Sequence, residues 1–216
     1  MCGRYYFKGS TDELQENIPL IQGESLGPPR YNIAPSQHAA VIRATQDGNE
    51  LTQLTWGLVP HWAKDLKTIK PQINARAETA HEKPFFRDAF RTRRCLIPAN
   101  GFFEWQRDRD RKQPYCIELT NHETFCFAGL WSRNTHGNAM ETFTILTCTP
   151  NNLMQQIHHR MPVILHREDY QTWLSGTTAQ VQTLLRPYPE SEMMAHTISE
   201  RVNNPRNDDP SLLEAL

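Results

Sequence analysis

Apolar and polar residues alternate in short stretches along most of the chain, and this pattern predicts a structure built mainly from β-strands. Tyr115, Ile117 and Leu119 alternate with polar neighbours, as a strand with one buried face requires. A turn at Asp47-Gly48-Asn49 joins two such stretches into a predicted hairpin. The predicted strands span 38–44, 50–56, 94–97, 101–106, 114–120, 124–132, 141–148 and 194–199.

Helices are predicted to be few and short. Ser10 and Glu13 have the spacing of a capping box, and Thr177 and Gln180 repeat it. Pro150 suits the first position of another helix. The predicted helices span 10–17, 82–92, 150–158, 167–174 and 178–185. Strands and helices in this order favour a single α+β domain dominated by antiparallel strands.

Two long segments carry no periodic pattern. Residues 19–37 contain four prolines and are predicted to be extended. Residues 57–76, around Trp62, are predicted to be irregular, and a loop of this length is often functional. The polar segment 203–209 is also expected to be irregular.

Composition narrows the class of protein only slightly. The chain has 216 residues, of which 38% are hydrophobic, and this is enough for one sizeable core. It carries 23 basic and 24 acidic residues, so only a local cluster of Arg and Lys could hold an anionic partner. No apolar stretch is long enough to span a membrane, and the N-terminus lacks the apolar region of a secretory signal. We therefore expect a cytoplasmic protein.

The number and spacing of the cysteines argue against disulfide bonds and against a zinc site made of four thiolates. The chain has an odd number of cysteines and no C-x-x-C pair, so neither a disulfide framework nor a four-thiolate zinc site is expected. Four of them lie in apolar, strand-like runs and are expected to be small buried hydrophobic residues: Cys95, Cys116, Cys126 and Cys148. Cys2 differs from them by its position.

Removal of Met1 would make Cys2 the first residue and create a 1,2-aminothiol. The α-amine ordinarily titrates near about 8 and the thiol near about 8.5, so both are partly nucleophilic near neutrality. An aldehyde can form a Schiff base with the amine, and the thiol can then close a five-membered thiazolidine. Two alternatives remain open: a Cys2 without a role, and an N-terminal nucleophile whose own amine is the base, as in amidohydrolases.

Two further side chains could move protons. Glu104 lies between Phe103 and Trp105, where burial would raise its pKa, although strand alternation also allows it to face solvent. His158 and His159 are adjacent and therefore point in different directions, which argues against a shared metal. One of them could be a general acid–base, or simply cap a helix end.

Candidate contacts to an anionic polymer are less specific. Asn74 and Arg76 lie on one side of an extended segment, which suits an amide hydrogen bond plus a phosphate contact, or a solvated turn. Trp62 is the best candidate for stacking on a base, whereas the other tryptophans favour the core. A run of arginines could follow a nucleic-acid backbone or form a solvated face; it comprises Arg87, Arg91, Arg93 and Arg94.

Seven motifs together resemble the SOS response-associated peptidase (SRAP) family, because they occur in that family's order. They are Met1-Cys2-Gly3-Arg4, Arg30-Tyr31-Asn32-Ile33-Ala34-Pro35, Trp56-Gly57-Leu58-Val59-Pro60, Asn74-Ala75-Arg76-Ala77-Glu78-Thr79, Arg94-Cys95-Leu96-Ile97-Pro98, Gly101-Phe102-Phe103-Glu104-Trp105 and Ile157-His158-His159-Arg160-Met161-Pro162. Val202-Asn203-Asn204 also fits. Phe102 and His159 depart from the residues common at their positions.

The resemblance implies a domain over residues 2–210 with a largely antiparallel, β-barrel-like core and short peripheral helices, followed by a tail at 211–216. It implies an enzyme that cross-links Cys2 to the ring-opened abasic sugar in single-stranded DNA as a thiazolidine, which protects the lesion. The peptidase label implies that the domain removes its own Met1. An N-terminal-nucleophile peptidase acting on itself or on other proteins is the alternative function, and a non-catalytic single-strand binder is a third.

The resemblance also implies the roles of the site residues. Cys2 is the nucleophile, Asn74 orients the sugar or the amine, Glu104 handles protons, and His158 protonates the opened sugar and assists reversal. Contacts to DNA are implied for Arg4, Pro35, Trp62, Arg76, Trp105 and Arg160. No cofactor or metal is expected. The implied protein is a monomer that associates with the nucleoid when engaged on DNA, with replication-fork proteins as candidate partners.

Overall fold

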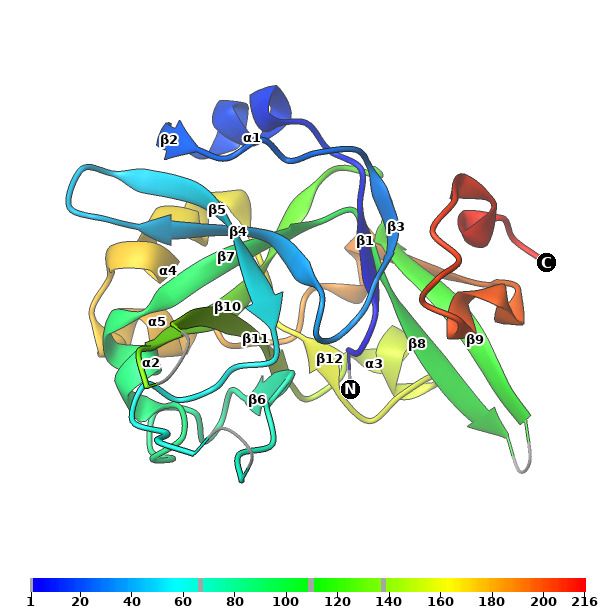
Figure 1. The fold of residues 1–216 in the computed structure, drawn as a ribbon. Helices are drawn as coiled ribbons and strands as arrows, with labels where there is room; N and C mark the ends of the chain where they lie inside the picture. Colours follow the sequence, from blue (N-terminus) through cyan, green and yellow to red (C-terminus); the bar gives the residue numbers. More distant parts are fainter. Residues whose placement is uncertain (1, 66–67, 109–110, 137–138) are drawn as a thin grey trace.

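Two sheets with short helices at their periphery make up the computed structural model (Figure 1), which describes residues 2–65, 68–108, 111–136 and 139–216. The first sheet has the strand order β14-β9-β8-β1-β3 and is antiparallel throughout. Its strands are β14 (Met193–Thr197), β9 (Arg111–Leu119), β8 (Gly101–Asp108), β1 (Tyr5–Phe7) and β3 (Arg30–Ile33).

The second sheet follows the order β12-β11-β10-β7-β4-β5-β2, and β5 also pairs with β11. This extra pairing closes β11, β10, β7, β4 and β5 into a ring. The bounds are β12 (Met161–Pro162), β11 (Met140–Cys148), β10 (Phe125–Asn134), β7 (Arg94–Ala99), β4 (His38–Ala44), β5 (Asn49–Trp56) and β2 (Leu20–Gly23), with β13 (Ile164–Leu165) on β10 and β6 (Asn74–Arg76) on β11. The predicted α+β class is confirmed, and the ring corresponds to its barrel-like core.

The ring is closed around aromatic side chains that the alternating pattern turns inward. Trp56 is fully buried, stacks on Phe143 with ring centroids 6.1 Å apart, and meets the ring of Tyr5 edge-on at 5.3 Å. Its indole N–H donates to the carbonyl oxygen of Ile73 at 2.9 Å. Trp56 therefore joins β1, β5, β11 and the approach to β6 in one core.

The first sheet is buried on both faces because its strands carry apolar residues at successive positions. Phe102 and Ile117 pair across β8 and β9 and face the main core. Phe103 and Cys116 pair one position further on and face a second, smaller core. The segment that follows β14, residues 198–216, is called the C-terminal segment. It covers this second core, and Leu212 is among its buried residues.

The absence of a side chain at Gly101 leaves room for the ring of Tyr6, which packs across this position. A Cβ atom there would lie 2.5 Å from the Tyr6 ring and 2.8 Å from the backbone oxygen of Ile117. We expect Gly101→Ala to lower the free energy of unfolding by about 1–3 kcal/mol, the usual cost of overpacking a filled site. Urea denaturation measures it, and an unchanged unfolding free energy would contradict this account of the packing.

The helices lie outside the sheets, and no helix in the described ranges is long and apolar enough to cross a membrane. The predicted caps at Ser10 and Thr177 are confirmed. The predicted start at Pro150 is wrong, because the side chain of Asn151 caps the helix instead. The α-helices are α1 (Thr11–Asn17), α2 (Arg87–Thr92), α3 (Asn152–Gln155), α4 (Tyr170–Ser175) and α5 (Thr178–Thr183), and the 3₁₀ helices are η1 (Arg167–Asp169), η2 (Glu190–Glu192), η3 (Glu200–Asn203) and η4 (Pro210–Leu213).

Both segments without a periodic pattern, the first predicted to be extended and the second irregular, contain strands. Residues 19–37 include β2 and β3, and residues 57–76 include β6. β2 and β6 run parallel to their partners, β5 and β11. These strands have three or four residues and pair with distant parts of the chain, so no local alternation could reveal them. β6 matters most, because it carries Asn74 and Arg76 to the edge of β11.

Candidate functional site

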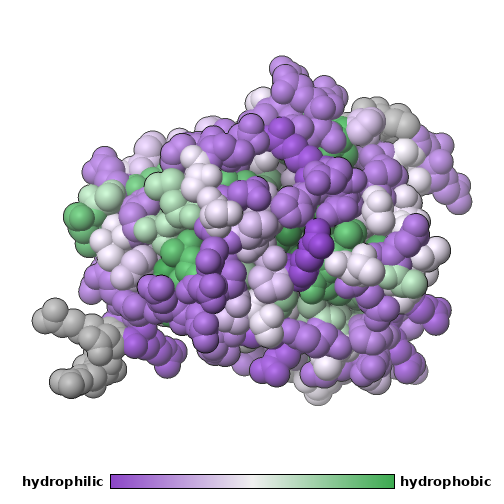
Figure 2. Space-filling model, turned by 180° about the vertical axis from the view of Figure 1, so that it is seen from behind, coloured by the Kyte–Doolittle hydropathy of each residue, from purple (hydrophilic) through white to green (hydrophobic). Residues whose placement is uncertain are grey.

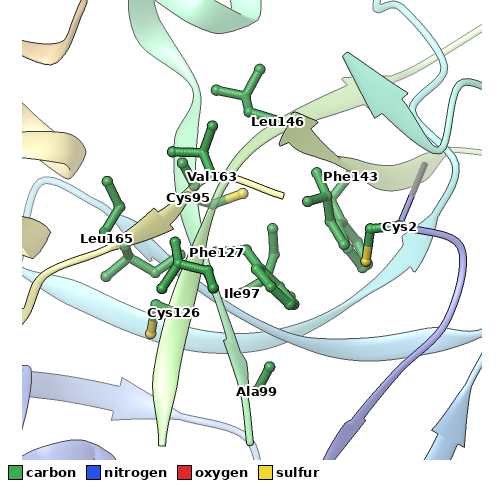
Figure 3. Packing of buried hydrophobic residues seen from close by; sticks show 14 of the residues in the cluster. Cys2, Cys95, Ile97, Ala99, Cys126, Phe127, Phe143, Leu146, Val163 and Leu165 are labelled. Carbon is green, nitrogen blue, oxygen red and sulfur yellow. The ribbon is translucent and has the colours of Figure 1, made fainter. Parts of the chain in front are cut away.

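Cys2 lies at the edge of the main core rather than on the surface. Its side chain is fully buried in the cluster that contains Phe127 and Phe143 (Figure 3). Burial raises the pKa of the Cys2 thiol well above its ordinary value, and the nearby Glu104 carboxylate raises it further. The thiol is therefore neutral near pH 7 and needs a proton acceptor before it can attack.

Glu104 is a buried carboxyl group close to this thiol. It is only 2% exposed, and burial raises its pKa. Glu104 pairs with Tyr115 on the inner face of β8, whereas Phe103 and Trp105 face the C-terminal segment. The alternative in which Glu104 faces solvent is thus excluded, because both faces of the strand are covered. A carboxyl group in this setting keeps its proton to a higher pH than an exposed one does, and it can act as a proton donor and then as an acceptor.

His158 approaches Glu104 from the turn between α3 and β12. Its Nδ1 lies 4.0 Å from Oε1 of Glu104. Nδ1 also lies 3.1 Å from both the backbone nitrogen and the backbone oxygen of Arg160, so it can accept from the first or donate to the second, depending on the tautomer. Burial lowers the pKa of His158, which favours the neutral form. The ring of His159 lies 4.3 Å from the ring of His158 and remains at the surface.

Arg160 is held inside the protein by an ion pair. Its two terminal nitrogens donate to the two carboxylate oxygens of Glu78 at 2.7 and 2.8 Å, and one also donates to the backbone oxygen of Thr147. Arg160 is only 8% exposed. Its backbone positions His158, and a phosphate would have to replace Glu78 to reach its guanidinium. Glu78 was not among the predicted site residues.

Arg4 is also engaged within the protein. One of its terminal nitrogens donates to the Asn32 side chain at 2.8 Å and to the backbone oxygen of Val202 at 2.7 Å. Arg4 thereby ties the N-terminal strand to the C-terminal segment. Arg76, by contrast, is exposed on β6. Of these three predicted phosphate contacts, Arg76 is the most open to solvent.

Asn74 is a buried amide that the fold leaves unsatisfied. Its side-chain nitrogen and oxygen are both buried, and neither has a hydrogen-bond partner among the described residues. An unmade hydrogen bond in such a place costs about 1–3 kcal/mol per group. A protein retains such a group most readily where a ligand satisfies it.

We expect Asn74→Leu to raise the free energy of unfolding by about 1 kcal/mol, because an apolar group of similar size removes the unsatisfied amide. The matched control is Asn100→Leu. The Asn100 amide is bonded on both sides, at 2.8 Å to the backbone N–H of Lys8 and at 2.9 Å to Thr124, so this change should destabilise the protein. Urea unfolding measures both variants. Equal destabilisation of the two would show that Asn74 has unseen structural bonds.

The remaining predicted residues lie in different surroundings. Trp105 donates from its indole nitrogen to the Asn203 side chain at 2.7 Å. Trp62 is 44% exposed and meets Phe85 edge-on, with ring centroids 6.4 Å apart. Pro35 is half-buried in the turn between β3 and β4. Trp62 is therefore available for stacking, whereas Trp105 is already oriented.

A pocket opens onto Glu104 and His158. It has a volume of about 390 Å³ and is lined by Glu104, Trp105, Arg107, Lys112, His158 and Asn203. A second hollow of about 690 Å³ shares Trp105, Arg107 and His158 with it and extends toward α3. The face of the molecule seen in Figure 2 is largely hydrophilic, with apolar groups in separate patches.

Two cations at this pocket were not among the predicted site residues. Arg107 and Lys112 pair directly across the β8–β9 hairpin, and both are exposed. Cross-strand partners place their side chains on the same face of a sheet. The hairpin register was the signal that could have found them. Together they make the entrance to Glu104 and His158 suitable for an anion.

The geometry thus combines a neutral thiol, a buried carboxyl group and a neutral imidazole beside a cationic entrance. Such a set can add a nucleophile to an electrophilic carbon while protons move between fixed groups. Removal of Met1 would add an amine to the set, but residue 1 lies outside the described part of the chain. Among the described residues, one group of potential metal ligands was found: Cys116, Glu118 and His196. Cys116 lies on the face of the first sheet opposite to the face that carries Glu104.

Comparisons with known proteins identify the family of this chain. The profile of a family described as SOS response associated peptidase (SRAP) matches residues 1–205. Among similar proteins, the abasic site processing protein YoqW of Bacillus subtilis is 44% identical over the full length of both chains. The abasic site processing protein YedK of Escherichia coli is 28% identical, again over both full lengths. A crystal structure of a protein from Bacteroides thetaiotaomicron, 26% identical, superposes with a TM-score of 0.85 over both full chains.

Proposed function

We propose that this chain, which belongs to the SOS response-associated peptidase (SRAP) family, processes abasic sites in single-stranded DNA by forming a thiazolidine between Cys2 and the opened sugar. The observation that carries the proposal is the burial of the Cys2 thiol beside Glu104, with His158 at 4.0 Å from that carboxyl group. Relatives named as abasic site processing proteins support the choice of substrate.

The first stage joins the α-amine of Cys2 to the aldehyde carbon of the opened sugar. The amine adds to the carbonyl group, and one amine proton passes to the oxygen, giving a carbinolamine. The protonated Glu104 gives its proton to the hydroxyl group, which leaves as water, and a protonated imine remains. The raised pKa of Glu104 keeps it protonated at a pH where an ordinary carboxyl group is ionised.

The second stage closes the ring. The Glu104 carboxylate takes the thiol proton of Cys2, and the sulfur adds to the imine carbon. The product is a neutral thiazolidine, Glu104 carries its proton again, and one water molecule has left. Because the thiol pKa is raised by burial, this proton transfer needs a base close by, and Glu104 is the buried carboxylate that acts on the thiol.

The surrounding residues bind and orient the substrate. We assign the neutral His158 a proton exchange at the sugar. It accepts the proton of the anomeric hydroxyl group and gives a proton to the ring oxygen as the ring opens, and the same exchange runs backwards during reversal. Asn74 supplies the unsatisfied amide that holds the sugar or the amine. Arg76 binds a phosphate, and the exposed Arg107 and Lys112 extend this path at the pocket.

The structure gives less support to the other predicted DNA contacts. Trp62 offers an exposed ring for a base, while Pro35 and Trp105 shape the path. Contacts of Arg4 and Arg160 to phosphate stay predictions, because both guanidinium groups already have partners within the protein. The removal of Met1 by the same nucleophile is part of the proposal.

Intact-protein mass spectrometry with a single-stranded oligonucleotide carrying one abasic site tests the proposal. We expect a protein without Met1 and an adduct at the summed mass minus one water. An oligonucleotide with a tetrahydrofuran in place of the sugar lacks the aldehyde and is the matched control. An adduct with that control would contradict the mechanism. A protein without Met1 that forms no adduct would favour a peptidase acting on other substrates.

A further inference from the structure

Three side chains with metal-binding atoms meet on the face of the first sheet that the C-terminal segment covers. Cys116 and Glu118 are two residues apart on β9, so both point to the same face. His196 on β14 is the direct cross-strand partner of Cys116. One sulfur, one carboxylate oxygen and one imidazole nitrogen from these residues all lie within 4.8 Å of one another. This face is opposite to the one that carries Glu104.

Neighbouring groups hold two of these side chains in place. Nε2 of His196 lies 3.0 Å from the backbone oxygen of Leu213, so Nε2 carries the proton and donates it. That leaves Nδ1 with a free lone pair, as a metal ligand requires. Oε1 of Glu118 accepts a hydrogen bond from the Tyr6 hydroxyl, whose ring crosses the space left by Gly101. Such outer contacts commonly orient metal ligands.

We propose that Cys116, Glu118 and His196 bind a zinc ion. Thiolate, imidazole and carboxylate are the ligands that zinc accepts in tetrahedral sites. Bonds of about 2.0–2.3 Å to the ion would draw these atoms to roughly 3.5 Å from one another, which needs only side-chain rotation. Binding releases the thiol proton of Cys116 to solvent and leaves one coordination position for water. The Tyr6 hydroxyl stays on Glu118.

The surroundings define what the ion must displace. Cys116 is fully buried, and the Glu118 side chain is 11% exposed. The imidazole Nδ1 of His122 lies 3.9 Å from Oε2 of Glu118, and the Lys8 ammonium lies over the Tyr6 ring at 6.0 Å. Both of these side chains are exposed and can turn toward solvent when a doubly charged ion takes their place.

Zinc here would stabilise the frame of the candidate functional site. His196 leads directly into the C-terminal segment, and its imidazole is bonded to Leu213 within that segment. The same segment supplies the Val202 carbonyl oxygen to Arg4 and the Asn203 side chain to Trp105. An ion that joins β14 to β9 therefore fastens the segment on which Arg4 and Trp105 depend.

Cobalt titration of the metal-free full chain tests the site, because thiolate-bound Co²⁺ absorbs in the near ultraviolet. We expect one equivalent to bind and zinc to displace it. Cys116→Ser and His196→Gln should each weaken binding by at least about 100-fold, since even outer contacts change affinity 10–100-fold. His196→Gln keeps an amide that can donate to Leu213. Circular dichroism confirms that each variant is folded.

Cys126→Ala and Cys2→Ala are the controls. Cys126 is an equally buried thiol elsewhere, and Cys2 is the other thiol near an acid and an imidazole. Both variants should keep the absorption and the zinc-dependent rise in Tm. Loss of the absorption in Cys2→Ala would place the ion at the N-terminus and overturn the proposal. So would unchanged affinity in His196→Gln, or the absence of stoichiometric binding in the wild-type protein.

Discussion

Replacing Cys2 with alanine is expected to abolish the heat-stable protein–DNA cross-link completely. The variant is prepared without Met1, by cleaving an N-terminal fusion directly before residue 2, so it keeps an α-amine at that position and can still form an imine with the abasic sugar. Without the sulfur no thiazolidine can close, and water reverses the imine. A denaturing gel after heating should therefore show no adduct, whereas borohydride added during the reaction should trap one by reducing the imine.

Two controls make this result specific to the aminothiol. Cys126→Ala removes a buried thiol that lies outside the candidate site and should leave cross-linking intact. An uncleaved extension before Met1 blocks the α-amine and should eliminate both the stable adduct and the borohydride-trapped one. A hydrolysis-resistant adduct in Cys2→Ala, or normal cross-linking by the extended protein, would contradict the thiazolidine mechanism.

The second large effect is expected from Glu104→Gln. Glutamine preserves the size of the side chain but cannot transfer a proton, so the rate of cross-link formation should fall by roughly 10²–10⁴-fold. In the wild-type protein Glu104 must start protonated to expel water from the carbinolamine, and burial raises its pKa. The wild-type rate should therefore fall as the pH rises through this raised pKa, and the variant should lack that dependence. Single-turnover rates over a pH series measure both. An unchanged rate would remove Glu104 from the chemistry.

Stability offers an independent check on the same residue. The pKa of Glu104 is raised from its ordinary value of 4.5 in the folded protein. A group of this kind stabilises the fold below the ordinary pKa, and that stabilisation is lost as the pH rises through the folded pKa. The unfolding free energy of Glu104→Gln relative to wild type should thus increase with pH across this window. A constant difference would show that Glu104 titrates normally.

The sequence predicted the fold best where strands are long and face a core on one side. The β4–β5 hairpin was found because a strand-like run of seven or eight residues lies on each side of one turn. β6 and β12 were not predicted, because a strand of two or three residues is too short to show a periodic pattern. Their pairing with β11 depends on contacts that form only in the folded chain.

For the candidate site, sequence and structure contributed different information. The ordered motifs supplied the set of residues, but alternation alone left the orientation of Glu104 open. The direction was decided by the C-terminal segment, which covers the other face of β8. Likewise, no local signal shows that Glu78 neutralises Arg160, because 82 positions separate the two residues. Long-range pairing of charges is the part that sequence reasoning could not supply.

The depth of Cys2 in the core has a consequence for the newly made chain. The groups that enclose it include Phe143 and, through Glu104, His158, which are synthesised long after it. At about 5–20 residues per second, translation reaches residue 158 roughly 8–30 s after Cys2 emerges. During that interval the thiol of Cys2 would be exposed to any small electrophile in the surrounding solution. Once the fold is complete, burial shields the Cys2 sulfur from solutes, and it can react only with a partner that reaches it through the folded protein.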